Sequence, residues 1–430
     1  MPSAFLHLVV IPVLFALILG LPSALIDPFY QPPVGFEKLP PGSILRERKV
    51  DAALFGLVPD PVFAHQLLYR TTAVNGSAIA TATTIFQPSH AMTDRFLSFH
   101  TAYDSASISC DPSYQYQLGA PQTDVFSTLE MLFIQRHLMN GYIVASPDYE
   151  GPDAALIAGR LEGMAVLDGM RAVVNFRNTL NLLTAEPAIV GAGYSGGGLA
   201  TGWAAALQSL YAPELNVKGW AMGGVPNNLT AAFLYLDNTT FSGFIPAAID
   251  GMLKPSAYQE QLQPVIDSII TEKGQALLDY GNTHCVVADL FNAPHQSMFS
   301  PDIQKLGTGL LRDPTIVSVL LDNLLPGERE ETPIAPVFIY HGLNDDVIDY
   351  TYIPAMVNTW CQRGVSVQFT TYVNGGHARV LLASVSETSA YIDEAFAGTL
   401  ENGYSTMAVC IRSGIGDALG DGPVSIGFVV

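Results

Sequence analysis

Residues 187–198 read PAIVGAGYSGGG, and this stretch decides the fold. The apolar run at 188–192 is typical of a short buried strand, and it leads directly into the pattern G-x-S-x-G at 193–197. Where a strand turns sharply into a helix, the residue at the turn takes strained backbone angles, and glycines around it remove side chains that would collide. The stretch therefore predicts a strand–turn–helix unit that exposes the Ser195 hydroxyl.

A serine hydroxyl needs a base before it attacks a carbonyl carbon near neutral pH, so the motif predicts a histidine and an acid farther along the chain. Asp345 is the leading acid because it lies in a polar turn after a strand-like apolar run, and its neighbours Asp346 and Asp349 are the alternatives. Of nine histidines, His377 alone lies beyond this acid, in a glycine-rich turn. The predicted catalytic residues are Ser195, Asp345 and His377.

The oxyanion of a tetrahedral intermediate needs hydrogen-bond donors close to the serine. The backbone N–H of Gly196, at the N-terminus of the expected helix, is the first predicted donor. A second is expected in the loop after an early strand, and residues 101–105 follow the apolar run at 96–100 without an H-G-G-G motif. Asp104 is the candidate there, through its backbone N–H or a protonated side chain; the alternative is an ordinary turn aspartate.

Short apolar runs alternate with helical patterns along the chain, which favours an α/β fold with a mostly parallel sheet covered on both faces. The expected strands lie at 96–100, 142–146, 188–192, 217–222, 337–341 and 365–372. A stretch of about 100 residues at 227–326 shows helical windows without a strong strand, and it is too long for an ordinary connection. We therefore expect a core of residues 25–226 and 327–430, with 227–326 inserted as a helical cap.

The charge balance excludes several classes of protein. The 430 residues include 39 acidic and 19 basic side chains, for a net charge of −20, and 49% are hydrophobic. A nucleic-acid partner needs a basic face, an anionic membrane would repel this chain, and a disordered regulator would be less hydrophobic. Four cysteines without a C-x-x-C pair argue against a zinc or dithiol centre. We expect neither a metal nor an organic cofactor.

The N-terminal residues predict export. Residues 5–21 form an apolar run that ends at small residues, so 1–24 are expected to be a signal peptide; an N-terminal membrane anchor is the alternative. An even number of cysteines in a secreted chain suggests two disulfides, with three possible connectivities. Three Asn-x-Ser/Thr sequons are candidate glycosylation sites: Asn75, Asn228 and Asn238.

With these motifs the chain resembles the fungal secretory lipase family, typified by Candida antarctica lipase A. Several matches lie far from the serine, which makes the resemblance specific. They are the segments 27–30 (DPFY), 69–72 (YRTT), 150–151 (EG), 162–169 (EGMAVLDG), 193–197 (GYSGG) and 211–215 (YAPEL). The region 227–326 matches poorly, and the tail after Cys410 is shorter than in that lipase. This tail could form a flap over the pocket or a frayed end.

The resemblance implies an α/β-hydrolase fold with a helical cap over the site. It also implies that Ser195, Asp345 and His377 form the triad and that Asp104 and Gly196 form the oxyanion hole. Two disulfides follow from the same resemblance. They join Cys110 to Cys285 and Cys361 to Cys410.

Taken together, these features predict a secreted serine carboxylic-ester hydrolase that works through an acyl-enzyme. The leading expectation is a monomeric lipase that cleaves triacylglycerol or other apolar esters and can work at a lipid–water interface, without a nucleic-acid partner. One alternative is an esterase that deacetylates a secondary metabolite, as the trichothecene deacetylases of the family do. A more remote alternative is a hydrolase-like protein that only binds ligands or partners.

Overall fold

The computed structural model of the protein describes residues 21–400 and the backbone of residues 411–416. Most of the expected signal peptide (1–24) and of its membrane-anchor alternative (5–21) lies outside the described residues, as does the tail beyond 416. Residues 411–416 of the tail, expected to form a flap or a frayed end, are instead a strand of the central sheet. Among the described helices, none combines the length and the apolar character that crossing a bilayer requires.

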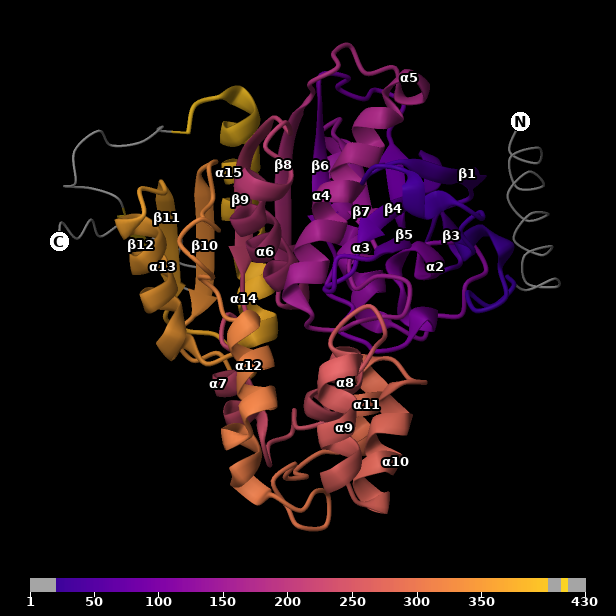
Figure 1. The fold of residues 1–430 in the computed structure, drawn as a ribbon. Coiled ribbons are helices and arrows are strands. Elements are labelled where there is room, and N and C mark those ends of the chain that lie inside the picture. The colour runs from indigo at the N-terminus through magenta and orange to yellow at the C-terminus, as the bar shows by residue number, and fades with distance from the viewer. Residues whose placement is uncertain (1–20, 401–410, 417–430) are drawn as a thin grey trace.

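A ten-stranded sheet forms the centre of the molecule (Figure 1), with strand order β1-β4-β5-β7-β6-β8-β9-β10-β11-β12. All neighbouring pairs from β7 to β12 are parallel, whereas β1, β4, β5 and β7 pair in antiparallel fashion. The strands are β1 (Ile44–Val50), β4 (Phe63–Thr72), β5 (Ala78–Gln87), β6 (Arg95–His100), β7 (Ile143–Pro147), β8 (Ala188–Tyr194), β9 (Val217–Gly223), β10 (Val337–Gly342), β11 (Val367–Tyr372) and β12 (Ile411–Gly416). The predicted α/β fold with a mostly parallel sheet is confirmed.

The sequence patterns located the parallel strands β6 to β11 but missed the parallel strand β12 and the antiparallel part. Each of the six expected strands overlaps a strand from β6 to β11. The long hairpin of β4 and β5 was not predicted, because it mixes apolar residues with buried polar ones. Gln66, for example, is fully buried, and its amide donates hydrogen bonds to the Thr84 hydroxyl and the Ser113 carbonyl. A run in which polar groups are satisfied by distant partners does not show the alternation on which strand prediction depends.

Helices cover both faces of the sheet. On one face lie α4 (Gly159–Asn175) and α6 (Gly196–Tyr211), and on the other α3 (Val125–Met139) and α15 (Val385–Ala397). The central strand β8 serves both layers, since Ile189 packs into the first and Val190 into the second. This follows from the two-residue period of a strand, and it explains why β8 is apolar throughout.

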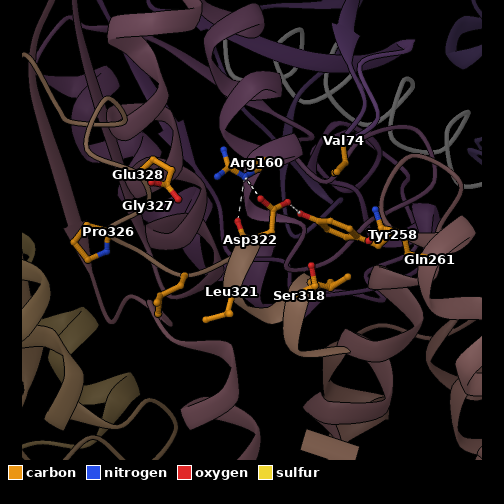
Figure 2. A pocket seen from close by; sticks show the side chains of 12 residues that line it. Val74, Arg160, Tyr258, Gln261, Ser318, Leu321, Asp322, Pro326, Gly327 and Glu328 are labelled. Carbon is orange, nitrogen blue, oxygen red and sulfur yellow. Dashed lines mark hydrogen bonds and ion pairs between the residues drawn. The ribbon is translucent and has the colours of Figure 1, made fainter. Parts of the chain in front are cut away.

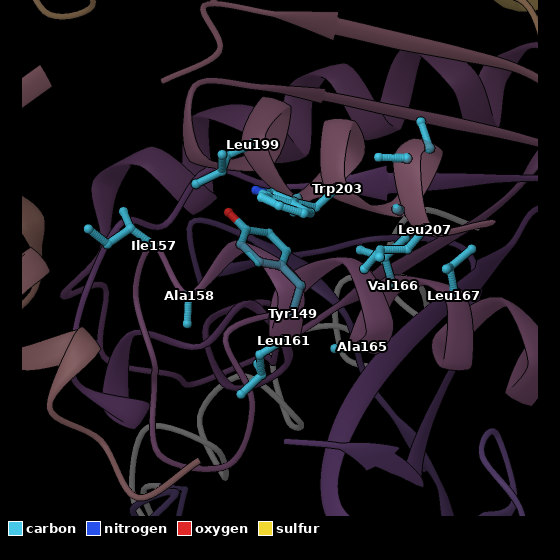
Figure 3. Close-up of a cluster of buried hydrophobic side chains, with 14 of the residues drawn as sticks. Tyr149, Ile157, Ala158, Leu161, Ala165, Val166, Leu167, Leu199, Trp203 and Leu207 are labelled. Carbon is cyan, nitrogen blue, oxygen red and sulfur yellow. The ribbon is translucent and has the colours of Figure 1, made fainter. Parts of the chain in front are cut away.

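Close contact between α4 and α6 fixes the layer beneath the Ser195 turn. Figure 3 shows the Trp203 indole of α6 near Tyr149, among apolar side chains of α4 and α6. A Cβ on Gly163 of α4 would lie 2.7 Å from the Trp203 carbonyl carbon and 2.9 Å from the Ala204 nitrogen. Only glycine allows the two helix backbones to approach this closely.

Between β9 and β10 the chain forms a group of helices, which occupies the lower part of Figure 1. The helices are α7 (Leu229–Leu236), α8 (Phe244–Met252), α9 (Gln259–Ile269), α10 (Glu272–Gly281), α11 (Val286–Asn292) and α12 (Pro314–Asp322). We refer to residues 227–326 as the helical insertion. They follow the end of β9, which neighbours the Ser195 strand β8, so the insertion lies near the serine.

We predict that Gly163→Ala destabilises the fold, because the added methyl group meets helix backbone that cannot yield. The expected loss is about 2 kcal/mol of unfolding free energy, measured by urea denaturation. Gly169→Ala in the same helix is the control, since its methyl group would meet the Tyr69 hydroxyl at 3.1 Å, and a side chain can shift. Equal stability of the two variants would contradict this reading of the α4–α6 contact.

Candidate active site

The predicted strand–turn–helix unit is present. β8 ends at Tyr194, α6 begins at Gly196, and the single residue between them, Ser195, has φ 55° and ψ −122°. A Cβ on Gly193 would overlap the Gly197 carbonyl oxygen, and one on Gly197 would overlap the His100 carbonyl oxygen. The glycines therefore permit a turn that places the serine at the carboxyl edge of the parallel strands.

Two hydrogen bonds join Ser195, His377 and Asp345. The Nδ1 atom of His377 lies 2.8 Å from the Asp345 Oδ2, and its Nε2 atom lies 2.8 Å from the Ser195 Oγ. Because a carboxylate only accepts hydrogen bonds, Nδ1 carries the proton in the neutral ring, and Nε2 accepts the Ser195 hydroxyl proton. The arrangement has the geometry that a general base and its orienting acid require.

The acid turn holds Asp345 in place through the backbone. Its Oδ1 accepts the N–H groups of Val347 at 2.9 Å and Ile348 at 2.8 Å. Burial acts to raise the pKa of Asp345, but the charge and hydrogen bond of His377, together with His341, hold this pKa below its usual value. Asp345 therefore keeps its negative charge beside the imidazole.

The two alternative acids, Asp346 and Asp349, make other hydrogen bonds. Asp346 Oδ1 accepts the backbone N–H of His377 at 2.8 Å, and the Asp349 side chain caps a short helix by accepting the N–H of Thr351. Neither interaction reaches the His377 ring.

Burial would lower the pKa of His377, but Asp345 outweighs burial and raises that pKa above its usual value.

Asp104 lies against the start of α6. A Cβ on Gly196 would overlap the Asp104 Oδ1, so this carboxyl group contacts the glycine backbone beside Ser195. The Asp104 backbone has φ 41°, an uncommon value outside glycine. Burial raises the pKa of Asp104 to about 6, although protonated His377 acts to lower it. The side chain can therefore hold a proton at a pH where an exposed aspartate is ionised.

Sequence analysis missed the residues that hold the Asp104 loop. The buried carboxylate of Glu130, in α3, accepts the Ala102 N–H at 3.0 Å. The Tyr103 hydroxyl accepts the Glu150 N–H at 2.9 Å. The one available signal was that Glu130 is the only acid in the segment that forms α3, between apolar neighbours.

A small apolar cavity of about 60 Å³ adjoins Ser195, Gly196 and Asp104. Side chains of the core, such as Ile157, and of the helical insertion, such as Phe233, line it together. A second cavity of about 60 Å³ lies inside the insertion, has an apolar lining, and shares Phe233 with the first. Phe233 thus stands between a space at the serine and a space deeper in the insertion.

A larger hollow lies away from Ser195. It is a polar groove of about 610 Å³ in which Arg160 pairs with Asp322 at 2.7 Å and Tyr258 donates to the same carboxylate (Figure 2). No residue of the Ser195 site lines this groove. Apolar surface next to the reactive hydroxyl is the better indication of where an ester binds.

The cysteines and sequons are placed as follows. Cys110 is joined to Cys285, as the resemblance implied, and this bond ties the core to the residue before α11. Cys361 is also disulfide-bonded, but Cys410 lies outside the described residues, so their pairing stays a prediction. Asn75 and Asn238 are exposed, whereas the Asn228 side chain caps α7 by accepting the Ala231 N–H. Glycosylation at these three sites also stays a prediction.

Among described residues, no cluster of three or more potential ligands is arranged to hold a metal ion.

The fold and site define an α/β hydrolase. Comparison with known proteins gives the family. A family model described as secretory lipase matches residues 116–403. A secreted triacylglycerol lipase of Malassezia furfur is 39% identical over 352 residues, which cover 81% of this chain and 74% of the relative. Lipase 10 of Candida albicans is 35% identical and covers 93% of this chain and 86% of its own.

The structure of Candida antarctica lipase A in its closed state matches with a TM-score of 0.81 at 30% identity, over 88% of both chains. The chain therefore belongs to the secretory lipase family. This confirms the predicted α/β-hydrolase fold, a carboxylic-ester hydrolase, and secretion.

We predict that Gly196→Ala lowers kcat by about 100-fold, because its methyl group would push the Asp104 carboxyl group away from Ser195. The helix itself should tolerate alanine, so unfolding free energy is expected to stay near the parent value. Hydrolysis of a p-nitrophenyl ester measures kcat. The control is Gly202→Ala in the same helix, whose methyl group would lie 3.0 Å from the flexible Leu325 Cδ1. An unchanged kcat for Gly196→Ala would show that the Asp104 contact does not matter.

Proposed function

We propose that the protein hydrolyses apolar carboxylic esters with Ser195 as nucleophile, His377 as general base and Asp345 as the acid that orients it. The single observation that carries this proposal is the hydrogen-bonded series from Ser195 Oγ through His377 to Asp345, with both links at 2.8 Å. The series lies at the edge of an apolar cavity, where a neutral ester can reach the hydroxyl.

In the first half of the reaction, Ser195 Oγ bonds to the ester carbonyl carbon while its proton passes to His377 Nε2. The carbonyl oxygen becomes an oxyanion. When the carbon–oxygen bond to the alcohol breaks, His377 returns the proton to the departing alcohol oxygen. In the second half, water attacks the acyl-enzyme, gives a proton to the same nitrogen, and releases the carboxylic acid as Ser195 regains its proton. Asp345 stabilises the imidazolium that forms in each half.

We infer that the Gly196 N–H and the protonated Asp104 carboxyl group donate to the oxyanion. Both line the cavity beside Ser195. The raised pKa of Asp104 supports a donor role for its side chain, because an ionised carboxylate could only repel the oxyanion.

The helical insertion lines part of the cavity at Ser195 and encloses the second cavity, and for this reason we treat residues 227–326 as a cap on a core of 25–226 and 327–430. Relatives named as triacylglycerol lipases favour triacylglycerol or another neutral lipid as substrate, presented at a lipid–water interface. The two cavities that meet at Phe233 could together take a longer acyl chain than either alone. One chain contributes every residue of the site, so a monomer suffices.

The small volume at the serine supports a second candidate. A cavity of about 60 Å³ accommodates an acetyl group without using the space beyond Phe233. An esterase that deacetylates a secondary metabolite would need no more.

A substrate panel tests the proposal. We predict that purified protein hydrolyses tributyrin and emulsified triolein, and that Ser195→Ala lowers each rate by at least about 10⁴-fold. Ser242→Ala is the matched control, since Ser242 is a fully buried serine of the helical insertion. Parent-like rates for Ser195→Ala would refute the nucleophile. Activity limited to soluble acetyl esters, such as an acetylated terpenoid, would replace the lipase assignment with the deacetylase.

The pH profile tests the Asp104 proton. Activity needs neutral His377 and protonated Asp104. Because the pKa of Asp104 is about 6 and that of His377 is raised above its usual value, Asp104 begins to ionise before His377 is fully neutral. The profile of kcat/KM against pH should therefore pass through a maximum and decline on the alkaline side, where the protonated fraction of Asp104 keeps falling. Asp104→Asn keeps an N–H donor at every pH, and we expect its profile to lack this alkaline decline. Asp289→Asn is the control, because Asp289 is another buried carboxyl group, and its burial raises its pKa to about 8. An unchanged alkaline decline in Asp104→Asn would assign the donor role to the backbone.

A further inference from the structure

The Asp104 loop is also where the core is joined to the helical insertion. Cys110 follows this loop by a few residues, and its partner Cys285 immediately precedes α11. A second, noncovalent link runs from Ser105 to Val286, the first residue of α11. Two connections therefore converge on one end of one helix of the insertion.

The Ser105 hydroxyl both donates and accepts a hydrogen bond. The side chain is fully buried. Its Oγ–H donates to the Tyr103 carbonyl at 2.8 Å, and the same Oγ accepts the Val286 N–H at 3.0 Å. The Val286 N–H belongs to the first turn of α11, where backbone N–H groups have no partner within the helix. In this buried position the Ser105 hydroxyl satisfies the amide.

The hydrogen bond from Ser105 to Tyr103 closes a turn around Asp104. Asp104 is the residue between them, and its positive φ is a conformation that persists only when surrounding contacts enforce it. The Tyr103 hydroxyl fixes the other side of this turn by accepting the Glu150 N–H. The position of the Asp104 carboxyl group therefore depends on where the Ser105 hydroxyl is held.

α11 in turn packs against α8, and α8 contributes Phe244 and Ala248 to the cavity beside Ser195. A Cβ on Gly243, just before α8, would overlap the Asp289 carbonyl oxygen of α11, so the two segments are in close contact. A shift of α11 would thus reach both the Ser105 hydroxyl and the wall of the cavity.

We propose that Ser105 is a positioning residue that couples the placement of α11 to the oxyanion donor Asp104. This rests on the proposed function, because it takes Asp104 to stabilise the oxyanion. When the insertion is docked as in this structure, the Val286 N–H orients the Ser105 hydroxyl toward the Tyr103 carbonyl, and the turn presents Asp104 to Gly196. The disulfide alone cannot orient the Ser105 hydroxyl, since it restrains the distance between two segments of the chain and makes no bond to the turn.

The test compares two buried serines. Ser105→Ala removes both hydrogen bonds, and kcat should fall about tenfold or more while KM stays within about twofold, because the cavity is unchanged. The matched control is Ser389→Ala. The buried Ser389 hydroxyl also donates to a carbonyl, that of Val385, and accepts an N–H, that of the Arg136 side chain, but both partners lie in the core, away from α11. Its kcat should stay within about twofold of the parent value.

Rates are expressed per active site, titrated with a fluorophosphonate, so that partial misfolding does not count as lost kcat. Equal kcat values for Ser105→Ala and the parent would overturn the proposal, as would an equal loss in Ser389→Ala. If Ser105→Ala does not fold, Ser105→Cys provides a side chain of similar shape with weak hydrogen bonds. One free thiol more than the parent then shows that the disulfide is intact, and the same fall in kcat at constant KM is expected.

A double-variant cycle separates this coupling from the proposed function. Ser105 acts through Asp104, so Ser105→Ala should cost little further kcat in an Asp104→Ala background. Full additivity of the two losses would overturn the coupling while leaving the oxyanion role intact. If Asp104→Ala alone keeps the parent kcat, the proposed oxyanion role of Asp104 fails instead, and the coupling fails with it.

Discussion

The structure depends on one steric constraint, which is that β8 must turn into α6 within a single residue. Ser195 takes a positive φ there, and the turn exists only because Gly193 and Gly197 have no side chain to meet the Gly197 and His100 carbonyl oxygens. The same lack of side chains lets the β6 end and its loop approach the start of α6. The constraint that strains the serine therefore also brings Asp104 into contact with Gly196.

Burial raises the pKa of most carboxyl groups around the site, and Asp345 is the exception because of its partners. Burial raises the pKa of Glu130, Glu150 and Glu162 well above the usual value, and it raises that of Asp104 to about 6. Asp345 differs because His377 and backbone N–H groups favour its ionised form. The negative charge at the site thus lies on Asp345, beside the imidazole, whereas burial favours the neutral form of the neighbouring acids.

The helical insertion acts as part of the site because it is fastened to the core at separate points. The disulfide Cys110–Cys285 and the Ser105–Val286 hydrogen bond hold one side, and the pairing of Arg160 with Asp322 holds another. Between these points, side chains from both parts enclose the cavity at Ser195. The shape of this cavity is consequently a property of how the two parts pack, which a local sequence pattern does not encode.

The sequence by itself determined the strand–turn–helix unit at Ser195, the parallel strands β6 to β11 and the secretory lipase family, because these depend on local backbone propensity and on motifs at fixed spacing. Only the tertiary structure decided that Asp345, and not Asp346 or Asp349, reaches His377, since three acids within one turn differ only in where the backbone points them. It also revealed the β4–β5 hairpin and the hydrogen bonds that Glu130 and Ser105 make. Their polar side chains are satisfied by partners far away in the chain, and such pairings form only when the whole fold brings those partners together.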